Sequence, residues 1–398
     1  MGCASREQGR NSQLSPRQGE NGQRPHEGFG RTPRPEGLYT GRVRVCAAIA
    51  ALTLLTQSQD AHRSFGEWLT GVKTEALSRG IRQEIVDEAL GHLDEPLPVV
   101  IERDRAQAEA VLSLERYVAR RLAPRSVKTG REMFARHRTL LDTIAWNYGV
   151  SPRVIVAVWG LESNFGRFSG VRPTVAALAT LAWDPRRSAF FRRELFDALA
   201  ILNRGDIDLA HMNGSWAGAM GQLQFMPSSY LKFAEDFDGD GRRDIWSTQA
   251  DIFASIANYL KGHGWTEGEP WGVEVKLSSE AAKKIAAGVA RRAGACQATR
   301  NMTVVQPAQA WRTLGVRLPN GKPLPKAMPD AAMVSGATRH FLVYGNYDAL
   351  LDYNCAHSYA VSVGLLADRI GSGSPAARPA PKRPTPPPAP ERTVGKAR

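Results

Sequence analysis

Apolar residues recur at helical spacing along most of the middle of the chain. One predicted helix has Ile81, Ile85, Val86, Ala89 and Leu90 on its apolar face, and a second has Leu112, Leu114, Tyr117, Val118 and Leu122. Between residues 272 and 333 this period is lost: residues 273–277 alternate like a strand, and residues 307–329 are rich in turn formers. A helical pattern returns at 359–370. The pattern predicts a mainly α (α+β) fold with a small β-containing insert.

These patterns divide the chain into three parts. Residues 62–370 form the predicted folded part, with a helical region at about 62–145, a helical core at about 146–265 and 341–370, and the insert at about 270–340. Residues 1–61 are predicted to be a disordered segment ending in an export signal, since Arg42 and Arg44 precede a short apolar stretch at 45–55. A buried helix is the alternative for that stretch. Residues 371–398, rich in Pro, Ala and basic residues, are predicted to be a disordered tail.

Composition narrows the classes of function. The chain has 398 residues, 42% hydrophobic and 23% charged, which excludes wholesale disorder and collagen. No run reaches the roughly 20 apolar residues of a transmembrane helix. The net charge is +13, but the tail holds six Lys or Arg residues against one acid, Glu391. A nucleic-acid interface needs basic residues on a folded face, so we expect no nucleic-acid partner.

The strongest single candidate for chemistry is a carboxyl at the end of an apolar helix. Ser151 and Pro152 are a helix start, with the Ser hydroxyl expected to cap the first amides. Residues 154–161 are apolar on every side, so this helix is predicted to be buried, and Glu162 follows shortly before a left-handed cap at Gly166. Apolar neighbours and the negative end of the helix dipole should raise the pKa of Glu162. The alternative is a Glu paired with a buried Arg or capping a loop.

A second candidate region is the glycine-rich segment 214–230. Its Gly, Ala and Ser residues permit close backbone approach, while Trp216 and Phe225 are predicted to offer flat apolar faces. Ser215 and Gln224 supply neutral donors and acceptors of the kind that sugar hydroxyls require. No Gly-Lys-Ser/Thr follows, so the segment is not a phosphate loop. Tight helix packing is the alternative explanation.

An acidic loop at 236–251 follows the pattern of a calcium-binding EF-hand at its start. Acids stand at loop positions 1, 3, 5 and 9 and Gly241 stands at position 6, whereas position 12 is Ser247 instead of Glu. Asp251 is the expected substitute. A turn that needs no metal is the alternative. The predicted calcium ligands are Asp236, Asp238, Asp240, Arg242 through its carbonyl, and Asp251.

The four cysteines indicate one disulfide. Cys3 and Cys46 lie in segments expected to be absent from the exported protein, which leaves Cys296 and Cys355. In an oxidising compartment this pair is predicted to form a disulfide, and two buried free thiols are the alternative.

Taken together and in this order, these motifs resemble the B-type lytic murein transglycosylases, which are similar to glycoside hydrolase family 103. The resemblance rests on Glu162-Ser163 closing an apolar helix, the glycine-rich segment, the acidic loop and the stretch from Tyr353-Asn354 to Tyr359, and it spans about residues 62–370. It implies a lysozyme-like core. Ala356 departs from the Ser that is frequent in relatives, so Asn354 and Tyr359 carry more weight than residue 356.

The resemblance implies an enzyme that cleaves the β-1,4 bond between N-acetylmuramic acid and N-acetylglucosamine in peptidoglycan. Glu162 would be the single acid and base, and the product would end in 1,6-anhydro-N-acetylmuramic acid. The alternatives are a muramidase-type hydrolase and a non-catalytic peptidoglycan-binding scaffold. The implied substrate-binding residues are Ser215, Gln224, Tyr259, Tyr353, Asn354 and Tyr359.

These expectations extend to ligands and location. The chemistry needs no cofactor, and any calcium would be structural. The expected partner is the peptidoglycan glycan strand, the expected location is the periplasm, and the expected state is a monomer.

Overall fold

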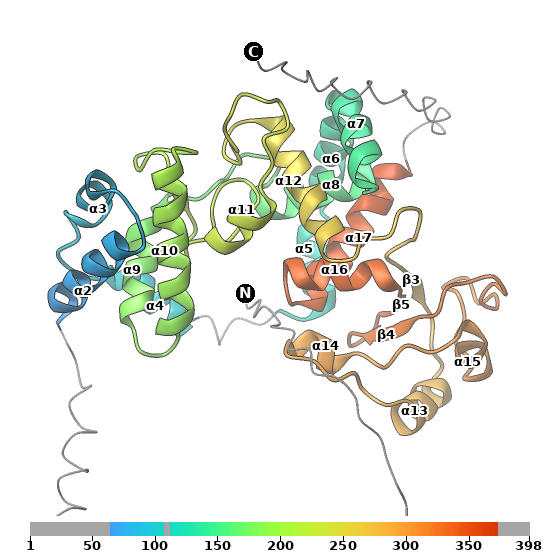
Figure 1. Ribbon diagram of the computed structural model, residues 1–398. Coiled ribbons are helices and arrows are strands. Elements are labelled where there is room, and N and C mark those ends of the chain that lie inside the picture. The colour runs from blue at the N-terminus through green and yellow to red at the C-terminus, as the bar shows by residue number, and fades with distance from the viewer. Residues whose placement is uncertain (1–63, 107–111, 373–398) are drawn as a thin grey trace, which may run out of the picture.

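The structure is a computed structural model that describes residues 64–106 and 112–372 (Figure 1). The predicted export segment, Cys3, Cys46 and the predicted tail lie outside the described residues. The described part is mainly α-helical, with one three-stranded sheet and one two-stranded ribbon. The mainly α fold with a small β-containing insert, predicted from the sequence, is therefore confirmed.

One group of helices lies on the left in Figure 1 and packs around α9 (Thr174–Trp183) and α10 (Ser188–Arg204). Its other members are α2 (Phe65–Ser78), α3 (Gln83–Leu90) and α4 (Pro98–Ala106). α2 begins with a capping box, in which Ser64 accepts from the Glu67 amide and the Glu67 carboxylate accepts from the Ser64 amide. Because α9 is apolar on nearly every side, α10 and α4 cover it.

The central group surrounds α8 (Pro152–Ser163), which is buried along most of its length. The other helices of the group are α5 (Leu114–Arg121), α6 (Pro124–Arg136), α7 (Arg138–Tyr148), α11 (Pro227–Phe233), α12 (Gln249–Gly262), α16 (Gly345–Tyr353) and α17 (His357–Gly371). α17 packs against α5, α6 and α8, while α12 packs against α7, α8, α11 and α16. The helices of residues 62–145 thus divide between the two groups.

The start of α8 differs from its prediction in one detail. Ser151 is the N-cap residue, but its side chain makes no capping hydrogen bond. Pro152 brings no N–H to satisfy, and the Ser151 carbonyl accepts from the amides of Val154 and Ile155 at 2.9 and 3.2 Å. The first turn of α8 therefore forms without a capping hydrogen bond from the Ser151 hydroxyl.

The insert lies at the lower right in Figure 1 and contains an antiparallel sheet in the order β3-β5-β4. The strands are β3 (Gly272–Val275), β4 (Ala332–Ser335) and β5 (His340–Val343), and the helices are α13 (Ser279–Gly288), α14 (Gln297–Asn301) and α15 (Ala308–Thr313). The predicted strand at 273–277 corresponds to β3, whereas β4 and β5 were not predicted. Within the described ranges, no helix is long and apolar enough to span a membrane.

Candidate active site

Glu162 lies in the last turn of α8, where its side chain is partly exposed but its carboxyl is densely enclosed by protein. Burial raises the pKa of Glu162 to about 7, and the Tyr359 hydroxyl and the Arg121 guanidinium lower it in part. The direction of this shift was predicted from the sequence. A carboxyl with this pKa is protonated in about half of the molecules at neutral pH, so it can serve as acid or base.

The chain turns sharply after Glu162. Asn164, Phe165 and Gly166 have φ values of 52°, 58° and 77°, so the left-handed segment begins two residues before the predicted cap at Gly166. The Ser163 hydroxyl fixes this turn, because it donates to the Trp159 carbonyl and accepts from the Gly166 amide. A side chain at residue 166 would collide with the Gln222 side chain.

A short ribbon brings the glycine-rich segment to the end of α8. β1 (Arg172–Pro173) pairs with β2 (Asn213–Gly214) in antiparallel register. Gly170 lies so close to the Gly214 backbone that a Cβ atom at 170 would be 2.1 Å from the Gly214 carbonyl carbon. These contacts set Gly214, the residue before Ser215, next to the segment that follows Glu162.

Within the glycine-rich segment, two polar side chains are held and partly exposed. The Ser215 oxygen accepts from the amides of Ala217 and Ala219, which leaves its O–H free to donate to a ligand. Gln224 has φ 53° and donates through Nε2 to the Gly221 carbonyl. The glycines themselves serve protein packing: a Cβ at 218 would meet Leu178 at 2.3 Å.

The prediction for Phe225 was wrong. Phe225 is 2% exposed, so it presents no flat face to a ligand. Its ring packs against Tyr259 and Tyr353, with centroid separations of 5.3 and 5.8 Å. The buried Phe225 ring therefore packs beneath these two tyrosines. Trp216, the other predicted flat face, is partly exposed.

The three tyrosines that the family resemblance implied do cluster. Tyr259 and Tyr353 have ring centroids 4.7 Å apart, and Tyr353 and Tyr359 are stacked at 6.2 Å. The hydroxyl of Tyr259 donates to the Asp352 carbonyl, and that of Tyr353 donates to the Leu223 carbonyl. The pKa values of Tyr353 and Tyr359 are raised well above the usual value by burial and next by the Glu162 carboxylate. Both phenols therefore stay neutral and face Glu162.

Asn354 and the Tyr359 hydroxyl complete this group. Asn354 is partly exposed and directly follows α16, with its backbone amide donating to the Leu350 carbonyl. The Tyr359 hydroxyl is buried and lacks a partner in standard hydrogen-bond geometry within the described residues, although it is near enough to Glu162 to lower the pKa of that carboxyl. It is available to a ligand or to the carboxyl itself.

Two further residues at Glu162 were missed in the sequence. Tyr117 and Arg121 both come from α5, and the pKa of Tyr117 is raised by burial, with Glu162 contributing. Arg121 donates to the carbonyl of Leu161, the residue before Glu162. In the sequence Tyr117 is one of several apolar-face residues and Arg121 one of several basic ones, so only the packing of α5 against α17 brings them to the site.

The acidic loop brings three predicted metal ligands together. Oxygens of Asp236, Asp238 and Asp251 all lie within 4.8 Å of one another. Asp251 is fully buried in the first turn of α12, and its two oxygens accept from the amides of Phe237 and Asp244 at 2.8 Å. Burial, and to a lesser degree Asp238, raises the pKa of Asp251 to about 6.

The structure does not bring every predicted ligand into that group. Asp240 is exposed, and its carboxylate accepts from the Arg242 amide at 2.8 Å instead. Asp244 accepts from the Ser247 amide and hydroxyl. Three clustered carboxylates are nevertheless a donor set that suits Ca²⁺, a hard cation that prefers oxygen.

Cys296 and Cys355 are joined by a disulfide, with their Cα atoms 6.1 Å apart. Cys296 is the N-cap residue of α14 in the insert, and Cys355 lies directly after Asn354. The bridge therefore attaches the insert to the segment that carries Asn354 and Tyr359.

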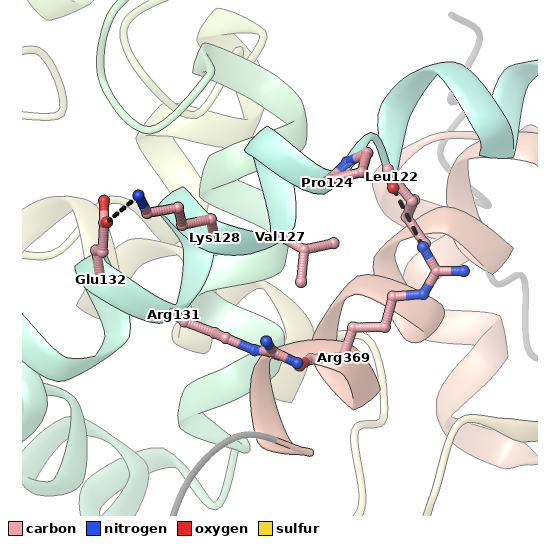
Figure 2. A pocket seen from close by; sticks show the side chains of 7 residues that line it. All are labelled: Leu122, Pro124, Val127, Lys128, Arg131, Glu132 and Arg369. Carbon is pink, nitrogen blue, oxygen red and sulfur yellow. Dashed lines mark hydrogen bonds and ion pairs between the residues drawn. The ribbon is translucent and has the colours of Figure 1, made fainter.

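A cavity of about 400 Å³ lies elsewhere, between α6 and the end of α17 (Figure 2). Its charged side chains are engaged with protein groups: Arg369 donates from α17 to the Leu122 carbonyl at 3.1 Å, and Lys128 pairs with Glu132 within α6 at 3.9 Å. None of its lining residues is a predicted site residue. The candidate active site is therefore the region around Glu162.

Comparisons with known proteins agree with this geometry. The profile of the family described as transglycosylase SLT domain matches residues 64–368. Over 156 residues the chain is 40% identical to membrane-bound lytic murein transglycosylase B of Escherichia coli (strain K12), an alignment that covers 39% of this chain and 43% of that protein.

Solved structures extend the similarity to most of the chain. SltB3 from Pseudomonas aeruginosa in complex with NAG-NAM-pentapeptide is 37% identical with a TM-score of 0.70, covering 81% of this chain and 84% of that one. The same protein is also known in complex with NAG-anhNAM-pentapeptide. The Escherichia coli lytic transglycosylase Slt35 in complex with calcium is 25% identical with a TM-score of 0.64, covering 78% and 94%. The predicted lysozyme-like core is confirmed, and the chain belongs to the transglycosylase SLT domain family.

Proposed function

We propose that this protein is a peptidoglycan lytic transglycosylase that cleaves the β-1,4 bond between N-acetylmuramic acid and N-acetylglucosamine. The observation that carries the proposal is the enclosed carboxyl of Glu162, with a pKa of about 7, at the end of α8 beside the glycine-rich segment. Membership of the family and the NAG-anhNAM-pentapeptide bound by the similar SltB3 support the same reaction.

In the proposed reaction Glu162 acts twice. The protonated carboxyl first donates its proton to the bridging oxygen, and the bond between that oxygen and C1 of N-acetylmuramic acid breaks. The 6-hydroxyl oxygen of the same sugar then bonds to C1, and its proton returns to the Glu162 carboxylate. Because the attacking group belongs to the substrate, no water is added, and intramolecular attack benefits from proximity.

The surroundings of Glu162 favour this lyase reaction over hydrolysis. A glycosidase that adds water uses a second carboxylate about 5–9.5 Å from the first. A nearby carboxylate would raise the pKa of Glu162, but the pKa is raised by burial and is otherwise shifted only by the Tyr359 hydroxyl and the Arg121 guanidinium among the described residues. A single group that alternates between acid and base fits this environment.

We propose that the sugar chain lies along the polar groups that face Glu162. Ser215 offers a free O–H, Gln224 offers its side-chain oxygen, and Tyr359 offers a buried hydroxyl. The partly exposed Tyr353 and Asn354 border the same region, and the Tyr259 ring packs against the Tyr353 ring in a tilted arrangement. Neutral hydrogen-bonding groups beside aromatic rings suit sugar hydroxyls and acetamido groups.

The test is a digest of purified peptidoglycan with the wild-type protein, with Glu162→Gln and with the control Glu88→Gln, which changes an exposed carboxyl on α3. We expect anhydro-ended muropeptides from the wild type and the control, and a loss of at least 100-fold with Glu162→Gln, as for removal of a general acid. Products heavier by one water would indicate a hydrolase. An absence of products despite binding would indicate a scaffold.

We also propose that Asp236, Asp238 and Asp251 hold a structural Ca²⁺, with further oxygens from Asp240 or the Arg242 carbonyl. The cluster of three carboxylates supports this, as does the calcium complex of the similar Slt35. When bound, the ion would neutralise carboxylates that otherwise repel one another at the start of α12. It has no part in the bond cleavage.

We propose that the protein acts as a monomer in the periplasm, where peptidoglycan is found. The basic, apolar and polar succession at 42–61 supports export. Fusion of residues 1–61 to a reporter that folds only outside the cytoplasm tests this, and size-exclusion chromatography tests the monomer.

A further inference from the structure

Arg121 occupies a distinctive position at the C-terminal end of α8. Its guanidinium donates to the Leu161 carbonyl and lies 5.7 Å from the centroid of the Tyr117 ring. Its Nε atom is buried without a partner among the described residues. An unsatisfied buried N–H is costly, so packing around Arg121 must help its hydrogen bond to Leu161 to hold the side chain there.

That restraint comes from the packing of α5. Arg369, near the end of α17, donates to the carbonyl of Leu122, the residue after Arg121 (Figure 2). α17 also packs along α5 and α8. The three helices therefore fix the distance between the Arg121 backbone and the end of α8.

The contact with Leu161 has an electrostatic consequence. The last carbonyls of a helix have no intrahelical partner and carry partial negative charge, which disfavours a carboxylate nearby. The Gly160 carbonyl accepts from the Asn164 amide, and the Leu161 carbonyl accepts from Arg121. A full positive charge thus offsets the negative helix end at the residue before Glu162.

The other titratable groups that face Glu162 are uncharged. Tyr117 comes from α5, Tyr353 from α16 and Tyr359 from α17, and burial raises the pKa of each phenol. From α12, Tyr259 packs against Tyr353. Among the described groups that act on Glu162, Arg121 is the charged one.

We propose that Arg121 is a positioning residue that orients the end of α8 and stabilises the carboxylate form of Glu162 in the second half of the reaction. The proposal rests on the proposed function. Without this charge, Glu162 would remain a competent acid but would form its carboxylate less readily, and the return of the proton from the 6-hydroxyl would slow.

The first test compares pH–activity profiles for Arg121→Gln, Arg121→Lys and the matched control Arg120→Gln. Arg120 is the neighbour of Arg121 on α5, lines the same cavity of about 230 Å³ and is not among the described groups that shift the pKa of Glu162. The alkaline limb of kcat/KM should lie near pH 7 in the wild type and rise by about one unit in Arg121→Gln. Arg121→Lys keeps the positive charge and should shift the pH of the alkaline limb less. Arg120→Gln should leave the pH of the alkaline limb unchanged.

A second measurement requires neither enzymatic activity nor a substitution of Arg121. The Arg121 Nε–Hε resonance of the isotopically labelled wild type is followed by NMR against pH. It should shift with a midpoint near 7, and this shift should vanish in Glu162→Gln, while the Arg120 resonance stays constant. A folded Arg121→Gln with an unmoved limb, or an Arg121 resonance that ignores Glu162, would overturn the proposal. An inactive wild type would instead overturn the proposed function and leave the NMR result intact.

Discussion

Backbone strain concentrates at the candidate active site. Among the described residues, the non-glycine positions with positive φ are Asn164, Phe165 and Gln224. Two of them directly follow the end of α8, and the third lies in the glycine-rich segment. Left-handed conformations of such residues cost about 1–3 kcal/mol each and persist only where the surroundings enforce them. The sequence could not reveal this strain, because Gly166 alone satisfies the usual pattern for the end of a helix.

Glu162 should make the folded protein less stable at neutral pH than its amide variant. Its pKa is about 7 when folded and near 4.5 when unfolded, so the folded state binds the proton more tightly. This tighter proton binding stabilises the folded state fully below pH 4.5, and the stabilisation is lost as the pH rises through 7. Glu162→Gln avoids this loss, and we expect it to be more stable than the wild type by about 2 kcal/mol at pH 8, after allowance for solvent screening.

Urea unfolding at pH 4, 6 and 8 measures this difference. The gain should shrink to almost nothing at pH 4, and Glu88→Gln should show no such dependence. Asp251, whose pKa is also raised, is present in both proteins and cancels from the comparison. A gain of equal size at every pH would show that the amide acts through packing instead of through the proton.

At the scale of single elements, the sequence was informative where a helix is apolar all round or a strand alternates. The first pattern predicted α8 and the second predicted β3, and each is present. β4 and β5 were not predicted because such short apolar stretches form strands only when they pair with a neighbouring strand, β5 with both β3 and β4. Arg121 was missed for a similar reason, since its partner at Leu161 lies 40 residues away in the sequence.

The acidic loop and the start of α12 should respond to calcium as one element. Without metal, burial disfavours the carboxylate form of Asp251 and raises its pKa from 3.8 to about 6 in the folded protein. The free energy of unfolding should therefore fall as the pH rises from about 4 to 6. A bound Ca²⁺ requires that carboxylate. Calcium should therefore raise the melting temperature by several degrees at pH 7.5 and much less at pH 5. A calcium concentration 100 times the Kd should stabilise the folded state by about 2.7 kcal/mol.

Differential scanning fluorimetry with Ca²⁺ or a chelator measures this effect. Asp251→Asn should abolish the response to calcium, whereas Asp208→Asn, which changes an exposed acid after α10, should retain it. If neither calcium nor chelator changed the melting temperature, the loop would bind no metal and would be a turn held by its backbone hydrogen bonds.

At the scale of the whole molecule, the insert and the helical core share one sheet. Val334, Phe341 and Val343 pack into the main hydrophobic core, while Met333 and Leu342 on the opposite face pack into the smaller core of the insert. This alternation follows from the two-residue period of a strand. The sheet therefore couples the two cores, so neither is expected to unfold alone.

The disulfide adds a second connection between the same two parts. It closes a loop with a sequence separation of 59 residues, which the entropy model values at about 4 kcal/mol. The ion pair between Arg292 and Asp348, at 2.7 Å, also joins the insert to α16. Removal of the bridge should weaken the attachment of the insert without releasing it.

We therefore expect Cys296→Ala/Cys355→Ala, or reduction of the wild type, to lower the melting temperature while calorimetry still shows a single transition. A single transition is required because the sheet remains packed on both sides after the bridge is lost. Reduction of the double variant serves as the control and should change nothing further. Activity on peptidoglycan should fall less than stability, because Asn354 and Tyr359 are also held by α16 and α17. Two separate transitions after reduction would mean that the disulfide, and not the shared sheet, unites the insert with the core.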